Sequence, residues 1–168
     1  ASWTELMLAE ACGFTGSEIM FSANDVPAGE FAYARRLGAT VNLDDITHVD
    51  VLRNNGGIPE EICLRFNPGG AFRIGNTIMG DPGDAKYGMT REQLTQALLQ
   101  MKPDGLKRFG LHAFLSSNTT DPLYYPTLAN LLFTVGKELM EETGLQLSFV
   151  NLSGGIGIPY RPEQEKAN

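Results

Sequence analysis

Positive charge is scarce in this chain. Its 168 residues include 13 lysines and arginines against 20 aspartates and glutamates, which gives a formal net charge of −7. A domain that binds nucleic acid needs a basic face to contact the phosphates, so this balance argues against a nucleic-acid partner. Long apolar runs are also missing, and there is neither a membrane-spanning segment nor a signal-peptide pattern. We therefore expect no nucleic-acid partner and no membrane partner.

Cysteine is scarce as well. The only two, Cys12 and Cys63, stand in apolar helical and strand contexts and lack the spacing of metal ligands. Thiols in such contexts are typical of the buried free cysteines of proteins kept in a reducing compartment. We expect two buried thiols, no metal site and a cytoplasmic location.

The rest of the sequence alternates between short apolar segments and amphipathic ones. Capping-box patterns at Ser2–Glu5 and Thr90–Gln93 mark the starts of two helices. Strands are expected over residues 18–24, 40–44, 62–67, 109–115 and 147–152, with a helix in each interval between them. Strict alternation without an internal repeat predicts one parallel sheet covered by helices.

An open sheet and part of a (β/α)8 TIM barrel both fit this alternation. Strands of an open parallel sheet lie under helices on both faces and are apolar almost throughout. Here every second strand residue is repeatedly polar, while the residues between them are apolar. The expected polar face consists of Ser22, Asn24, Asn42, Asp44, Arg65, Asn67, His112 and Asn151. A shared polar face favours the α/β class with a partial barrel, whose site would lie at the carboxyl ends of the strands.

The segment 147–160 is the most informative stretch of the chain. Its apolar strand ends on Ser153-Gly154-Gly155, followed by Gly157. Successive backbone N–H groups at such a strand end can hold a phosphate. A tight turn with glycines at positive φ, without any ligand, explains the same pattern.

Several segments, in this order, resemble the barrel domain of pyridoxal-phosphate-dependent decarboxylases of the alanine-racemase-like fold type, and most closely the diaminopimelate decarboxylases. These segments are residues 1–6, 21–25, 42–45, 62–69, 86–89, 109–112 and 151–160. The resemblance implies that residues 1–168 are one fragment of the barrel, roughly strands three to seven of eight. It implies that the first strands and a C-terminal β-domain lie outside this chain. The lysine that binds the cofactor as a Schiff base is expected upstream, so no catalytic residue is expected here.

The same resemblance assigns cofactor-binding roles to the end of the chain. Gly154 and Gly155 match the family's phosphate-binding glycines, and Ser153 stands where a third glycine is usual. Ser117 matches a serine that helps to bind the phosphate. Phe114 replaces the family's ring-stacking histidine, so it can stack on the cofactor ring but cannot hydrogen-bond to it.

Three further residues have a structural interpretation as well as a functional one. His112 precedes Phe114 by two residues on the same face and is either a cofactor contact or an ordinary core histidine. Arg65 faces the inferred barrel interior, where an unpaired charge is costly, so it should find a carboxylate such as Asp44. It is a cofactor contact or a purely structural ion pair. Lys86 is expected to be a solvated loop lysine and not the Schiff-base lysine.

The resemblance implies that the complete protein uses pyridoxal 5′-phosphate to decarboxylate meso-diaminopimelate, a small amino-acid substrate, to L-lysine. It also implies a homodimer. Two alternatives remain open on the residues alone. One is a decarboxylase of another basic amino acid or of a carboxylated polyamine on the same barrel. The other, suggested by Phe114 and Ser153, is a non-catalytic homologue that binds the cofactor or a partner.

Overall fold

Five parallel strands and five α-helices alternate along the chain in a computed structural model that describes residues 1–69 and 87–164. The strands are β1 (Met20–Ser22), β2 (Thr40–Leu43), β3 (Glu61–Arg65), β4 (Arg108–His112) and β5 (Gln146–Asn151). The helices are α1 (Trp3–Ala11), α2 (Ala28–Arg36), α3 (His48–Asn55), α4 (Arg91–Met101) and α5 (Tyr124–Thr143). Short 3₁₀ turns, η1 (Gly16–Glu18) and η5 (Lys102–Asp104), follow α1 and α4.

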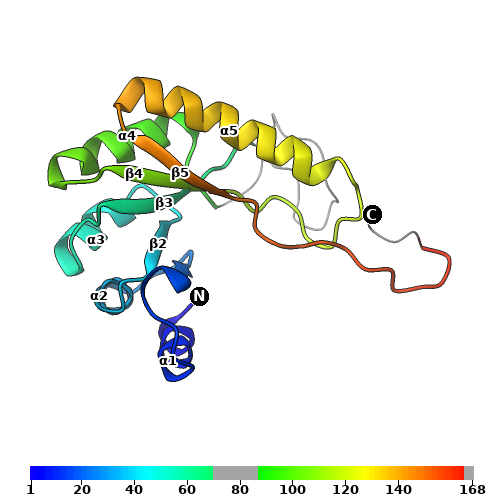
Figure 1. The fold of residues 1–168 in the computed structure, drawn as a ribbon, viewed down its shortest axis with the longest axis horizontal. Coiled ribbons are helices and arrows are strands. Elements are labelled where there is room, and N and C mark those ends of the chain that lie inside the picture. Colours follow the sequence, from blue (N-terminus) through cyan, green and yellow to red (C-terminus); the bar gives the residue numbers. More distant parts are fainter. Residues whose placement is uncertain (70–86, 165–168) are drawn as a thin grey trace.

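The sheet has the strand order β1-β2-β3-β4-β5, with every neighbouring pair parallel. The helices follow one another in an arc around the outside of the strands, each in contact with the next (Figure 1). Among the described residues β1 and β5 are the two edges of the sheet. This arrangement is that of successive β/α units of a parallel barrel, as the sequence predicts.

The apolar side chains of the strands pack outward against the helices and form the core. Burial of apolar surface of this kind is the main stabilising contribution to such a fold. The core includes Phe21, Val41, Leu43, Ile62, Leu64, Phe109 and Leu111 from the strands, and Phe31, Leu52, Leu94, Leu98, Leu128 and Leu132 from the helices. The other side of the sheet holds the polar residues, so the predicted division into two faces is confirmed.

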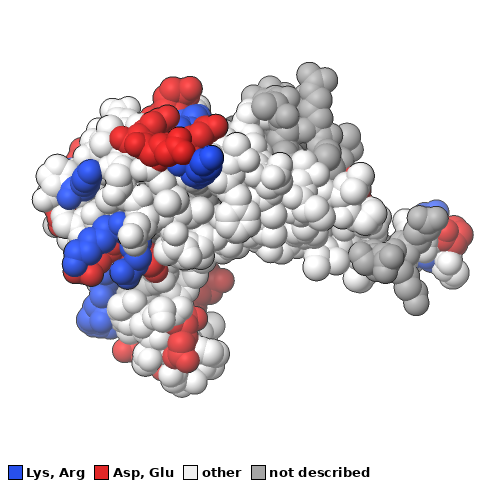
Figure 2. Space-filling view, turned by 45° about the horizontal axis from the view of Figure 1, so that its top comes forward, with Lys and Arg blue, Asp and Glu red and all other residues white. Residues whose placement is uncertain are grey.

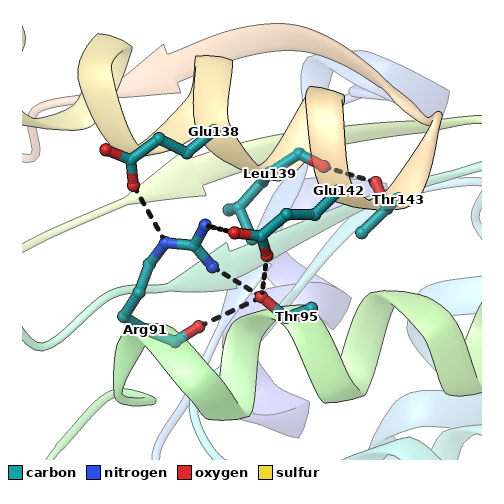
Figure 3. Close-up of polar contacts among 6 residues, drawn as sticks. All are labelled: Arg91, Thr95, Glu138, Leu139, Glu142 and Thr143. Carbon is teal, nitrogen blue, oxygen red and sulfur yellow. Dashed lines mark hydrogen bonds and ion pairs between the residues drawn. The ribbon is translucent and has the colours of Figure 1, made fainter.

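The start of α4 is fixed by its predicted capping box. The Thr90 hydroxyl accepts a hydrogen bond from the Gln93 N–H, and the Gln93 side chain accepts one from the Thr90 N–H at 2.9 Å. One residue further on, Arg91 contacts Glu138 at 3.3 Å and Glu142 at 2.7 Å, both on α5 (Figure 3). The ion pairs therefore join the first turn of α4 to the last turns of α5.

Charged side chains gather over the helices at one end of the molecule, with acidic and basic groups next to each other (Figure 2). Within the described residues, none of the helices is both long and apolar enough to span a bilayer. The described part of the chain also contains no cluster of His, Cys, Asp or Glu that could hold a metal ion.

Three details differ from the sequence predictions. At the start of α1 the predicted capping box is not formed, because the Ser2 hydroxyl donates to Glu5 Oε2 at 2.9 Å and makes no capping hydrogen bond to the helix backbone. Cys12 is exposed, because α1 ends one residue before it and buries only Leu6, whereas Cys63 is buried in β3 as predicted. Several strands end one to three residues earlier than expected. The apolar pattern continues past β4 through the buried Ala113 and Leu115, although the strand itself ends at His112.

Candidate functional site

A cavity of about 460 Å³ opens at the carboxyl ends of the strands. Its lining comes from four of the five strands or the residues just after them, together with Tyr87. The lining residues are Met20, Ser22, Asn24, Arg65, Tyr87, His112, Phe114, Asn151 and Ser153. This volume is typical of sites for small molecules. The carboxyl ends of the strands are also where parallel barrels bind their ligands.

Arg65 connects the ends of several strands beneath this cavity. Its Nη1 donates to Asp44 Oδ1 at 2.8 Å and to Asn24 Oδ1 at 3.0 Å, and its Nη2 donates to the Phe114 carbonyl at 3.4 Å. The guanidinium also lies over the Tyr87 ring, 5.3 Å from its centroid. The predicted Asp44 partner is therefore confirmed. The contacts to Tyr87 and to the Phe114 carbonyl were not predicted, because they depend on how distant loops fold back.

His112 lies beside Arg65 in the sheet, since the two residues are register partners of β4 and β3. Its side chain is buried, and its Nδ1 has no hydrogen-bond partner among the described residues. Burial first, and then the positive charge of Arg65, lower the pKa of His112 to about 4. The imidazole is therefore neutral near pH 7 and can donate or accept a hydrogen bond without adding charge.

Phe114 and Ser117 follow His112 on the segment after β4. Phe114 is partly buried and lines the cavity, where it forms an apolar wall. Ser117 is half-buried and lies outside the cavity lining, beside the glycine segment. An ideal Cβ built on Gly155 would lie 3.2 Å from the Ser117 Cα.

The segment after β5 turns sharply at Ser153, whose φ of 63° is unusual for a residue with a side chain. Its N–H donates to Asn151 Oδ1 at 2.7 Å, and this hydrogen bond forms an Asx turn. An asparagine just before a glycine-rich segment could have indicated this turn from the sequence.

The two glycines that follow differ in their surroundings. Gly155 has a φ of 96°, and a Cβ there would meet the Ser116 carbonyl oxygen at 2.8 Å, so backbone packing alone requires glycine. Gly154 faces open space. Within the described residues, neither Gly154 nor Gly155 donates its backbone N–H to a hydrogen bond. The tight turn and the anion-binding interpretation are thus compatible, because the turn leaves two donors available.

Fold and cavity together define the chain as part of a parallel β/α barrel with a small-molecule site at the carboxyl ends of its strands. The chain belongs to the family described as "Pyridoxal-dependent decarboxylase, pyridoxal binding domain", whose model matches residues 1–168. The predicted family and its pyridoxal cofactor are thereby confirmed.

The names of similar proteins are consistent with this family. The chain is 30% identical over 165 residues to protein TabA of Pseudomonas amygdali pv. tabaci, covering 98% of this chain and 38% of that protein. It is 28% identical over 162 residues to diaminopimelate decarboxylase of Thermoplasma acidophilum, covering 95% and 39%. The structure of the M. jannaschii diaminopimelate decarboxylase in complex with L-lysine matches with a TM-score of 0.82 and 21% identity, over 98% of this chain and 39% of that one. This chain thus spans well under half the length of these relatives.

The residues present fit pyridoxal phosphate. Two backbone N–H donors are available where an anion can lie, and an apolar ring lines the cavity at Phe114. The buried, neutral imidazole of His112 has an Nδ1 atom without a partner among the described residues. The predicted residues His112, Phe114, Arg65 and Ser153 line one cavity, whereas Gly154, Gly155 and Ser117 lie on the two segments beside it. Lys86 is outside the described residues.

Proposed function

We propose that this chain forms one part of the cofactor site of a decarboxylase that converts meso-diaminopimelate to L-lysine and carbon dioxide. The observation that supports this most is the meeting of Phe114 and the neutral His112 in one cavity beside a turn with two unengaged backbone donors. When bound, pyridoxal phosphate supplies the electron sink that amino-acid decarboxylation requires.

In this proposal the residues after β4 and β5 hold the cofactor. The N–H groups of Gly154 and Gly155 bind its phosphate, assisted by the hydroxyls of Ser153 and Ser117. Backbone donors suit a phosphate because they are fixed in place and lose little entropy on binding. Phe114 packs against the ring face and excludes water from it.

Arg65 and His112 line the same cavity as Phe114. Arg65 is already engaged with Asp44, so its charge is largely balanced within the protein. It supports Phe114 through that residue's carbonyl, and its charge adds to the effect of burial in keeping His112 neutral. His112 then offers an uncharged hydrogen-bonding group to the ring's polar substituents.

The choice of meso-diaminopimelate as the proposed substrate is based on the names of the relatives. Proteins named diaminopimelate decarboxylase are 28% identical in T. acidophilum, 29% in Methanothermobacter thermautotrophicus and 26% in Archaeoglobus fulgidus. A homodimer and a cytoplasmic location belong to the same proposal.

Carbon dioxide release by the complete protein, loaded with pyridoxal phosphate, tests the proposal. Meso-diaminopimelate should be turned over faster than L-lysine, L-ornithine or a carboxylated polyamine. Preference for one of these competitors would change the proposed substrate but would leave the proposed reaction class, amino-acid decarboxylation, unchanged. Cofactor binding without any turnover would instead indicate a non-catalytic homologue. Residues 1–168 alone should release no carbon dioxide, because the Schiff-base lysine is expected outside them.

A further inference from the structure

The turn after β5 is held from the helical layer as well as from the sheet. Tyr125, in the first turn of α5, donates its hydroxyl to the Gly154 carbonyl at 3.0 Å. The next carbonyl, that of Gly155, accepts from the Thr119 N–H at 2.9 Å. Both contacts join residues far apart in sequence, and the Tyr125 contact spans 29 positions.

The Tyr125 contact determines which way one donor of the turn points. No peptide bond in the described chain is cis. In a trans peptide the carbonyl and the following N–H point in opposite directions. The Gly154 carbonyl points to Tyr125, so the N–H of Gly155 is directed away from α5.

The turn contains two further backbone N–H groups, those of Ser153 and Gly154. The Ser153 N–H is engaged by Asn151 and is therefore unavailable to a ligand. Ser153 and Gly155, on either side of Gly154, both have positive φ values, and successive backbone N–H groups in such a turn can bind an anion. The Gly154 and Gly155 N–H groups are thus its two available donors, and Tyr125 orients the second.

We propose that Tyr125 is a positioning residue for the phosphate of the cofactor, acting through the Gly154–Gly155 peptide. This inference rests on the function proposed above, since it needs an anion in the turn. The Tyr125 ring packs edge-to-face on the Tyr124 ring, with 4.9 Å between the ring centroids. Phenylalanine would preserve this contact, so the hydroxyl can be removed with little effect on packing.

The test compares two ligands that differ only in the phosphate. Affinities of the complete protein for pyridoxal 5′-phosphate and for pyridoxal are measured by absorbance or fluorescence titration, in the parent protein and in Tyr125→Phe. The variant should bind pyridoxal phosphate about fivefold more weakly, which corresponds to one ordinary hydrogen bond, and pyridoxal equally well. Tyr160→Phe, on the exposed segment beyond the turn, is the matched control and should change neither affinity.

The outcomes separate this inference from the proposed function. A parent protein that prefers the phosphorylated ligand, with that preference intact in Tyr125→Phe, would overturn the role of Tyr125 and leave the proposed function standing. Equal weakening of both ligands would also overturn it, because a general structural role acts on both. A parent protein that binds both ligands equally well would refute the phosphate site itself, and the inference with it.

Discussion

Arg65 and Asp44 form an ion pair whose side chains are only 8% and 5% exposed, with 2.8 Å between Nη1 and Oδ1. Two charges in such a position are stable together, but either one alone is costly to bury. The pair therefore holds the carboxyl ends of β2 and β3 in a fixed relation below the cavity.

Asp44→Asn should consequently destabilise the protein by about 3 kcal/mol, because it leaves the Arg65 charge uncompensated in a buried position. Urea denaturation monitored by circular dichroism measures this. Glu60→Gln is the matched control, since it breaks the Lys107–Glu60 pair, whose side chains are both 62% exposed. The control should leave the unfolding midpoint unchanged. Equal effects of the two substitutions would contradict the importance of the buried pair.

His112 gives a second prediction, on pH. Burial and the Arg65 charge lower the pKa of His112 from 6.5 to about 4 in the folded protein. Between these values the unfolded chain binds a proton that the folded protein does not. Stability from this residue is therefore present above pH 6.5 and is lost as the pH falls towards 4, by up to about 3 kcal/mol.

His112→Gln should remove this contribution. Free energies of unfolding at pH 7 and pH 4.5, for the parent protein and the variant, provide the measurement. The parent protein should lose about 2.5 kcal/mol more than the variant between the two pH values. Parallel losses in both proteins would show that His112 titrates normally in the fold.

The sequence predicted the architecture because periodicity is a local property. Alternating polar and apolar residues in the strands indicated two faces, and the polar one now contains Asn42, Arg65 and His112 as expected. The Arg65–Asp44 pair could be predicted because an isolated buried charge has a high energy. Both predictions needed only strand geometry and electrostatics.

The tertiary contacts of the turn could not be predicted from the sequence. No local pattern indicates that Tyr125 reaches Gly154, or that Gly155 rather than Gly154 is packed against the Ser116 carbonyl. The exposure of Cys12 depends on where α1 ends, and an apolar neighbourhood in sequence does not fix that end. The roles of individual residues in the turn therefore follow only from the three-dimensional structure.

The two glycines of the turn should respond differently to substitution. Gly155→Ala combines an unfavourable positive φ with a Cβ only 2.8 Å from the Ser116 carbonyl oxygen. It should cost at least about 1–2 kcal/mol of stability from the φ alone. Gly154→Ala, with open space around its Cβ, should leave the thermal unfolding midpoint nearly unchanged.

A larger side chain at Gly154 separates folding from ligand binding. Gly154→Leu should leave stability close to that of Gly154→Ala but weaken the binding of pyridoxal phosphate, because the added atoms occupy the space beside the two N–H donors. Titration with the cofactor, alongside thermal unfolding, distinguishes the two effects. Unchanged cofactor affinity in Gly154→Leu would contradict the placement of the phosphate at this turn.

Gly110 and Phe149 provide the last prediction, on how the barrel interior is filled. These register partners on β4 and β5 are so close that a Cβ on Gly110 would lie 2.3 Å from the Phe149 ring. Gly110→Ala must displace the ring and should cost about 1–3 kcal/mol, a typical penalty for overpacking. Because the clash depends on the ring, the same substitution should cost much less in a Phe149→Ala background. A double-mutant cycle of unfolding free energies measures the coupling. Additive effects would mean that Gly110 is required for its backbone and not for the space that it leaves to Phe149.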